Sequence, residues 1–404
     1  MNFKKAFKDI AVWLGLSVMI GVLGGAVGAG FFFSVSAVTV IRENNSWLIF
    51  LLPVSGLLSV AVSGGSRSSG FGTKAVIDCS KDSEKSVPLN LSFSVFIGTV
   101  LTHLCGGSAG KEGAALQIGG GISAIVSKLF KIDKSRQKTL ILCSMAALFA
   151  AVFGTPLTAA VFVMEAARLK KERYIEFLPA GVSAIVGFIV ANALGVEPER
   201  LYIPKIENIS GKLILILFGI SVAAALIGEL FCYALKFVSK NAKKLFKNDY
   251  LIIFVGAVLV IAVTLIIGNH DYNGSSINVL HNIFSKSEVK YEAFALKLLL
   301  TVITVSFGFK GGQIIPSLFI GAAFGGAVGM LFGVSVPIAA AVGLAAMFCS
   351  VTNCTVASVL LCLELFGGSG ILYLTAASVI SRLVSGKINL YGDTPSIYKI
   401  FKKQ

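Results

Sequence analysis

The sequence predicts an all-α integral membrane protein that crosses the bilayer many times. Hydrophobic residues make up 55% of the 404 positions and charged residues only 14%, whereas soluble domains carry about 25% charged residues. Apolar stretches long enough to reach across a bilayer recur along the whole chain. Glycine-rich loops interrupt these stretches at similar places in the two halves, which is typical of transporters.

The apolar stretches are the segments that we expect to be helical. They cover residues 11–41, 47–63, 91–107, 139–166, 175–195, 211–235, 250–268, 293–309, 313–349 and 354–382. One helix needs about 20 residues to cross the hydrocarbon, so several stretches must contain two helices or a broken helix. We expect one transporter domain over 1–404, with repeat halves at about 1–205 and 206–390 and a short cytoplasmic tail over 391–404.

The basic residues lie mainly in short loops between apolar stretches. The net charge is +15, and Lys and Arg cluster at residues 4–8, 128–138, 168–173, 240–247 and 399–403. Such loops stay on the cytoplasmic side of a cell membrane, so we expect a multi-pass protein with both termini in the cytoplasm. The distribution excludes nucleic acid as a partner, because a DNA-binding protein gathers its basic residues on one soluble surface.

Residues 106–121, GGSAGKEGAALQIGGG, place Lys111 and Glu112 inside an otherwise uncharged segment. A carboxylate at bilayer depth is costly, so by default it marks an ion or proton pathway. The many glycines allow backbone N–H groups to converge on a small anion, and helix N-termini favour negative charge. No acidic cluster that would suit a cation is present, so the segment predicts anion transport.

The two halves contain an internal repeat. Residues 145–165 align without a gap on residues 344–364, and both copies end in glutamate, Glu165 and Glu364. The loop 106–121 similarly faces 311–326. We interpret the two acids as structural, since such residues more often cap or pair helices. Duplicated halves with interrupted helices place a binding site near the bilayer midplane.

Three segments resemble the pore motifs of the CLC family of chloride channels and proton-coupled anion antiporters. Residues 110–113, GKEG, are close to the family's GREGP or GKEGP, with Ala114 at the proline position. Residues 311–316, GGQIIP, resemble GGxFxP, and residues 70–74, GFGTK, are the weakest match to GSGIP. The resemblance runs from about residue 60 to the C-terminus. It implies a CLC-type inverted repeat of broken and tilted helices and a homodimer with one pore per subunit. We expect no CBS domains, since the sequence ends soon after Tyr398.

The resemblance also implies roles for individual residues. Glu112 would be the gate that occupies the anion path, swings aside when protonated and carries the proton. Tyr391 would line the inner anion site, with Tyr398 as a competing candidate. The expected anion-binding residues are Phe71, Thr73, Gly110, Lys111, Gly113, Ile315, Phe319 and Tyr391.

Two departures from the family pattern bear on the substrate. Phe71 stands where chloride-selective members have a pore serine, and Ala166 stands where chloride/proton antiporters have an internal glutamate. Both features resemble the fluoride/proton antiporter branch, although Ile315 is less polar than that branch would suggest. We favour proton-coupled halide antiport, with fluoride ahead of chloride; a passive chloride channel is the alternative.

The sequence supports an enzyme less well than a transporter. Residues 106–110 fit G-x-S-x-G by chance, since that motif needs a soluble α/β sheet. The better enzyme rival is an intramembrane serine protease in which His270 or His281 pairs with Ser108. The polar segment 268–276 reads as an exposed loop, which argues against it. The three histidines are too scattered for a metal site, and the seven cysteines suit buried thiols. We therefore expect neither enzyme activity nor a cofactor.

Overall fold

The computed structural model describes residues 3–64, 71–82, 84–204 and 210–393, with side chains from residue 12 onward. Helices dominate these ranges, which contain no β-strand. The first half contains α1 (Phe3–Asn44), η1 (Ser46–Leu51), α2 (Leu52–Val62), α4 (Thr73–Lys81), α5 (Leu91–Leu104), α6 (Glu112–Leu129), α7 (Lys134–Phe153), α8 (Pro156–Ala167), η2 (Lys171–Glu176) and α9 (Phe177–Ala193). The second half contains α10 (Gly211–Leu245), α11 (Asp249–Ile267), α12 (Ile277–Ser285), α13 (Ala293–Ser306), α14 (Ile314–Phe332), α15 (Val336–Thr352), α16 (Thr355–Phe366) and α17 (Ile371–Val384).

The longest apolar stretches are broken as expected. Stretch 139–166 contains α7 and α8, stretch 313–349 contains α14 and α15, and stretch 354–382 contains α16 and α17. Gly154 ends α7 with φ +74° and Gly333 ends α14 with φ +68°, a left-handed conformation that glycine adopts without strain. Proline then stands in the first turn of both following helices, where its missing N–H costs nothing.

The internal repeat is visible in the helix boundaries. Residues 153 and 156, which end α7 and begin α8, correspond at the aligned spacing to residues 352 and 355, which end α15 and begin α16. Between them Gly154 and Asn353 both adopt a left-handed conformation, with φ +74° and +56°. The same break therefore occurs in both halves, once with glycine and once with asparagine.

The glycine-rich loops correspond in a different register from the one that the sequence suggested. Helix α5 and helix α13 both have 14 residues, and each leads through a short loop to α6 or α14. Glu112 begins α6 and Ile314 begins α14, so these two positions are equivalent. The alignment of 106–121 on 311–326 is thus wrong by three residues, because it matched glycines rather than helix starts.

Helices α8 and α16 show that the repeat is inverted. Glu364, near the end of α16, accepts a hydrogen bond from the backbone N–H of Thr158 in the first turn of α8, at 2.8 Å. Glu165, near the end of α8, accepts one from Ala357 in the first turn of α16, at 2.7 Å. Each helix begins beside the other's end, so the two run antiparallel. Each acid satisfies N–H groups that a helix start leaves unpaired.

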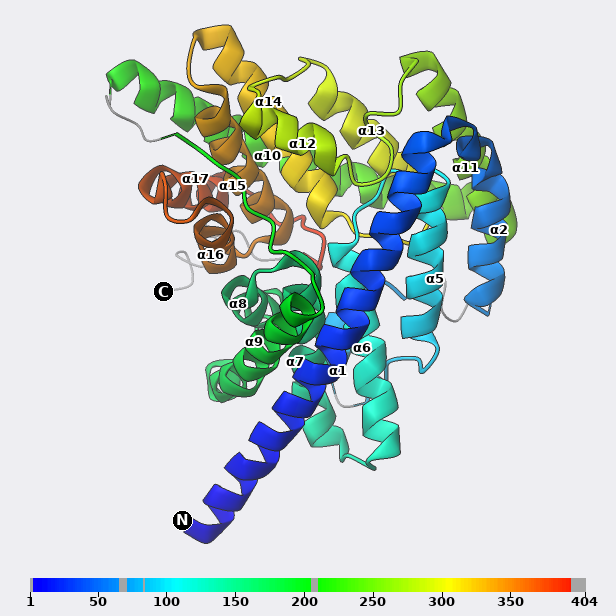
Figure 1. Ribbon diagram of the computed structural model, residues 1–404, viewed down its shortest axis with the longest axis vertical. Helices are drawn as coiled ribbons and strands as arrows, with labels where there is room; N and C mark the ends of the chain where they lie inside the picture. The colour runs from blue at the N-terminus through cyan, green and yellow to red at the C-terminus, as the bar shows by residue number, and fades with distance from the viewer. Residues whose placement is uncertain (1–2, 65–70, 83, 205–209, 394–404) are drawn as a thin grey trace.

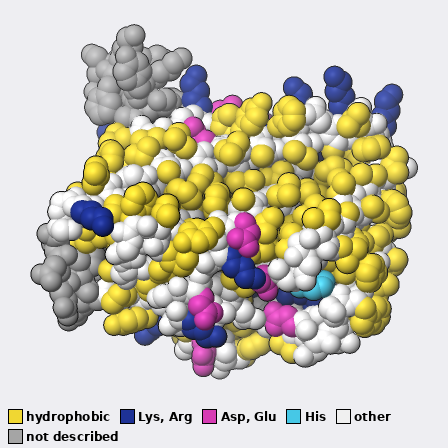
Figure 2. All heavy atoms as spheres, turned by 90° about the horizontal axis from the view of Figure 1, so that it is seen from above, with side chains coloured by type: hydrophobic (Ala, Val, Ile, Leu, Met, Phe, Trp, Pro, Cys, Tyr) yellow, Lys and Arg dark blue, Asp and Glu magenta, His cyan; other side chains and the backbone are white. Residues whose placement is uncertain are grey.

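The outer surface is a membrane surface. Among the described residues, six helical segments are long and apolar enough to cross a bilayer: Val12–Asn44, Lys134–Phe153, Lys171–Ala193, Gly211–Leu245, Asp249–Ile267 and Ile314–Phe332. Figure 2 shows a broad hydrophobic band, with Lys and Arg side chains projecting from one edge. In Figure 1, α6, α7 and α9 of the first half lie in the lower part of the view, and α10, α13 and α14 of the second half lie in the upper part; α6 and α14 contact each other. The interior is helix packed on helix, with α14 against α15 and α6 against α7.

Candidate functional site

The loops that begin α6 and α14 meet at a pair of glycines. The backbone N–H of Gly110 donates to the carbonyl of Gly312 at 2.8 Å, and Gly312 donates back to Gly110 at 2.6 Å. A β-carbon on Gly113 would lie 2.7 Å from the Gly312 Cα, which is too close for any side chain. Glycine at these positions therefore lets the N-terminal ends of two helices, one from each half, come together inside the protein.

Glu112 is the first residue of α6 and lies at this meeting point. Only 1% of its surface is exposed. Within the described residues its Oε2 atom has no hydrogen-bond partner, and a β-carbon on Gly110 would lie 3.0 Å from that oxygen. Since helix N-termini carry partial positive charge, the same ends that hold this carboxylate could hold an anion instead.

A third helix begins beside the same loop. Thr73 is the first residue of α4, and its hydroxyl donates to the Gly113 carbonyl at 3.2 Å. The side chain of Gln117 donates in turn to the Thr73 hydroxyl at 3.2 Å. Gln117 was missed by the sequence analysis, although it is the one amide in the apolar run after Glu112. Phe71, partly buried, stands two positions before the start of α4; Gly70 of the same motif lies outside the described residues.

Lys111 points toward α1 rather than to a carboxylate. Its Nζ lies 3.7 Å from the centre of the Phe32 ring, a cation–π contact that holds the ammonium beside the start of α6. The lysine thus places a positive charge next to Glu112 in the chain while its head group packs on an aromatic face.

Ile315 and Phe319 lie on the first turns of α14 and are both buried. A β-carbon on Gly110 would lie 3.1 Å from the Ile315 Cβ, so Ile315 belongs to the meeting point of the two loops. Phe319 makes an edge contact with Tyr272, with ring centres 6.3 Å apart, and the Lys297 ammonium lies 5.8 Å from its centre.

Tyr391 lies on an aromatic cluster formed by α7, α8 and α15. Its ring and the Phe162 ring are arranged edge to face, with ring centres 5.7 Å apart. Phe162 also packs on Phe149 and Phe348. The next residue, Gly392, abuts α4, since a β-carbon there would lie 3.0 Å from the Lys74 Cε. The segment around Tyr391 therefore lies beside a side chain of α4; Tyr398 is outside the described residues.

Lys297 is a buried lysine that the sequence analysis missed. Its ammonium donates to the carbonyls of Tyr272 and Gly274 and to the hydroxyl of Ser276, at 2.7–3.1 Å. Gly274 in turn accepts from the backbone N–H of Ala109 at 3.1 Å. The lysine thus braces the loop before Glu112 from the second half. Its signal was a lone charge within the apolar stretch 293–309.

The structure does not assemble a serine nucleophile. Ser108 is fully buried, and its hydroxyl bonds to the Tyr272 carbonyl at 2.9 Å and the Thr301 hydroxyl at 3.0 Å. His281 bonds to Glu199 instead. The expectation that 268–276 is an exposed loop was wrong in its second part, because Tyr272 is only 1% exposed. That loop turns inward to bond the segment before Glu112.

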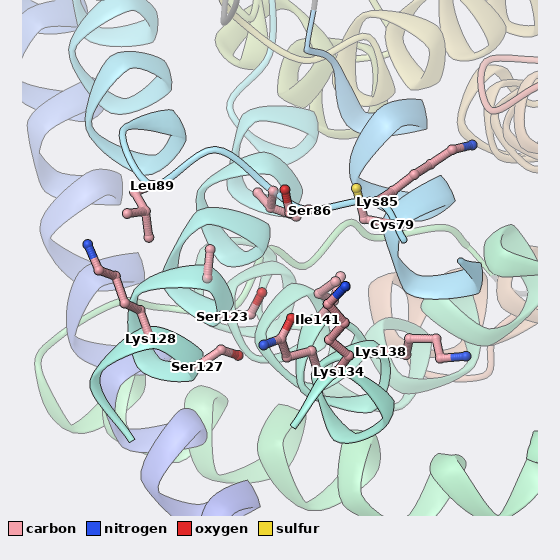
Figure 3. Close-up of a pocket in the computed structure, with 13 residues that line it drawn as sticks. Cys79, Lys85, Ser86, Leu89, Ser123, Ser127, Lys128, Lys134, Lys138 and Ile141 are labelled. Atoms are coloured by element: carbon pink, nitrogen blue, oxygen red, sulfur yellow. The ribbon is translucent and has the colours of Figure 1, made fainter. Parts of the chain in front are cut away.

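A surface pocket lies at the other end of the α6–α7 hairpin, away from Glu112. Its lining includes Ser123 and Ser127 of α6, with Lys128 on one side and Lys85 and Lys138 on the other (Figure 3). The lysines extend away from one another rather than toward a common point. The pocket gathers positive charge at this edge of the protein, as loops at the cytoplasmic membrane surface commonly do.

Comparisons with known proteins show which family this chain resembles. A family model described as voltage gated chloride channel matches residues 59–386. The chloride/fluoride channel protein of Pseudomonas syringae pv. tomato is 31% identical over 95% of this chain and 86% of its own length. An H(+)/Cl(-) exchange transporter of Vibrio campbellii is 24% identical over 63% of this chain and 58% of its own length.

Solved structures show the same fold. A structure described as a CLC-type fluoride/proton antiporter matches 95% of this chain and 98% of its own, with a TM-score of 0.90 and 30% identity. A slow cyanobacterial Cl-/H+ antiporter matches 97% of both chains, with a TM-score of 0.78 and 18% identity. The chain is therefore an integral membrane protein that belongs to the CLC, or voltage gated chloride channel, family.

Proposed function

We propose that this protein exchanges a halide for protons across the cell membrane, with Glu112 as gate and proton carrier. The observation that carries the proposal is the buried Glu112 carboxylate, whose Oε2 has no hydrogen-bond partner among the described residues. It stands where two helix N-termini meet, so it competes with an anion for the same positive ends. A carboxylate that accepts a proton loses the charge that holds it there and gives way to the anion.

Fluoride is the preferred halide in this proposal. The similar solved structure with 30% identity is described as a fluoride/proton antiporter, and the Pseudomonas relative is named for both chloride and fluoride. Phe71 offers no hydroxyl at the start of α4, and Ala166 is a buried apolar residue near the end of α8. We assign anion binding to the α4, α6 and α14 starts and to the C-terminal tyrosine: Phe71, Thr73, Gly110, Lys111, Gly113, Ile315, Phe319 and Tyr391.

The arrangement in the membrane follows from the charges. We propose that the edge with projecting Lys and Arg side chains (Figure 2) faces the cytoplasm and that both termini are cytoplasmic. We further propose that two copies associate as a homodimer, with Glu165 and Glu364 as structural caps, and that the protein has no enzymatic activity. Cross-linking in native membranes tests the dimer, since it should yield a product of twice the chain mass.

Efflux from liposomes tests the proposed function. Fluoride and chloride electrodes follow halide loss while a pH electrode follows proton uptake by the same vesicles. We expect fluoride to leave faster than chloride and protons to enter in fixed proportion to fluoride. Equal rates for both halides would overturn the fluoride preference. Halide loss without proton uptake would favour a passive channel, with Glu112 as a gate alone.

A further inference from the structure

A second carboxylate, Glu199, lies at the same end of the α6–α7 hairpin as Glu112. Helices α6 and α7 pack against each other across a short turn, so the C-terminal end of α7 lies beside the start of α6. The linker between the two halves crosses this end: a β-carbon on Gly154 would lie 2.5 Å from the Pro198 Cα and 3.5 Å from the Glu199 backbone N. Glu199 is thereby fixed near the buried site.

Glu199 is paired with a histidine from the other half. Its Oε2 lies 3.2 Å from Nε2 of His281 on α12. The hydrogen bond that His281 donates to the Glu199 carboxylate raises the pKa of His281. Burial raises the pKa of Glu199, but the His281 hydrogen bond and the Lys111 charge outweigh it, so that pKa is lowered. The pair can therefore hold a proton near neutral pH, since His281 binds it more readily than a free imidazole.

Four titratable groups interact here, and they come from three parts of the fold. Glu199 on the linker interacts electrostatically with Lys111 and Glu112 at the start of α6, as well as with His281 on α12. Their exposure forms a gradient: the side chain of His281 is 43% exposed and that of Glu199 21% exposed, while Glu112 is 1% exposed. Protonatable groups thus extend from solvent to the buried carboxylate.

We propose that Glu199 and His281 form a proton station that supplies Glu112 from the solution on this side of the membrane. A proton bound by His281 passes to the Glu199 carboxylate, which returns the imidazole to its neutral form. Glu199 then gives the proton, by way of solvent, to the Glu112 carboxylate and becomes an anion again. One proton moves and nothing else is consumed. The inference rests on the proposed antiport, because only an antiporter must protonate Glu112 in every cycle.

Fluoride efflux at a series of equal internal and external pH values tests the station. We expect Glu199→Gln to slow exchange by about 100-fold near pH 8, the lower end of the contribution of a general acid, and to approach the wild-type rate near pH 5, where hydronium can reach Glu112 directly. The number of protons moved per fluoride should stay at the wild-type value. His281→Asn should change the pH profile in the same direction, and Glu199→Asp should restore most of the rate.

Glu197→Gln is the matched control, because this exposed acid stands two positions earlier on the same linker; its profile should follow the wild type. A Glu199→Gln profile that runs parallel to the wild type at every pH would overturn the station, even if the rate fell throughout. Should Glu199→Gln fail to elute as a single species in detergent, the His281→Asn and Glu199→Asp profiles decide the same question. A wild-type protein that moves fluoride without protons would instead overturn the proposed function.

Discussion

At the scale of single residues, glycines set the distance between the starts of α6 and α14. Gly110 and Gly312 exchange hydrogen bonds, and Gly113 packs directly on the Gly312 backbone. A methyl group at these positions would push the starts of α6 and α14 apart. The positive helix ends would then no longer converge on one anion, and Glu112 would lose its place between them.

Gly113→Ala should therefore both destabilise the protein and stop transport. The new β-carbon would lie 2.7 Å from the Gly312 Cα, and overpacking of this kind costs about 1–3 kcal/mol. Thermal unfolding in detergent and fluoride efflux measure the two effects. Gly219→Ala is the control, since a β-carbon on Gly219 of α10 has no heavy atom within 4 Å. An active Gly113→Ala protein with an unchanged Tm would contradict the packing described here.

The Glu199–His281 pair should make stability depend on pH. Because the pKa of His281 is raised, its contribution to the free energy of unfolding is complete below the ordinary histidine pKa of about 6.5. That contribution is lost as pH rises through the pKa of His281 in the folded protein. Because the pKa of Glu199 is lowered, its contribution to the free energy of unfolding is complete above the ordinary glutamate pKa of about 4.3. That contribution is lost as pH falls through the lower pKa of Glu199 in the folded protein. The Tm difference between wild type and His281→Asn should thus be largest between these limits. A difference that grows steadily from pH 6 to pH 9 would contradict the pairing.

At the scale of elements, the inverted repeat lets each half complete the other. Helix α8 and helix α16 each begin where the other ends, and each supplies a carboxylate to the other's first turn. The loops before α6 and α14 share a hydrogen-bonded pair in the same way. These contacts join residues about 200 positions apart, so the starts of α8 and α16 each depend on an acid from the other half.

Glu364→Ala should lower the Tm by removing the cap of α8. Loss of a helix cap costs about 1 kcal/mol, and Glu165→Ala should cost a similar amount at α16. The ratio of protons to fluoride in liposomes should not change in either variant, because both carboxylates are already engaged by groups in the first turn of the partner helix. A loss of proton coupling with an unchanged Tm would show that these acids carry protons instead of capping helices.

At the scale of the whole molecule, the sequence predicted the membrane class, the broken helices and the repeat, because glycine, proline and apolar length act locally. Gly154 and Gly333 end helices wherever the chain folds. The predicted alignment of the two glycine-rich loops was wrong, since matching their glycines differs by three residues from matching the starts of α6 and α14. The partnership of Glu199 with His281 could not be predicted, because 82 positions separate them and only the packing of the linker over α7 brings them together.

Lys297 shows a different limit. A lone lysine in an apolar stretch indicates a functional site by the same argument as Glu112. The role of Lys297, however, depends on the three oxygens of the loop 272–276 to which it donates. Lys297→Met keeps the length of the side chain and removes the donors. We expect it to lower the Tm and to slow fluoride efflux, because the loop before Glu112 loses its brace. Lys290→Met, at a surface lysine paired with Asp271, should leave both nearly unchanged; equal effects of the two substitutions would contradict the bracing role.

The central claim is that protons and halide are coupled through Glu112, and uphill transport tests it most directly. Vesicles with equal fluoride on both sides receive an imposed pH difference while the membrane potential is clamped at zero. We predict that the wild-type protein accumulates fluoride against its own gradient, whereas Glu112→Gln, which cannot carry a proton, does not. If the wild type never moves fluoride uphill, or if Glu112→Gln still does, the proposed mechanism is wrong.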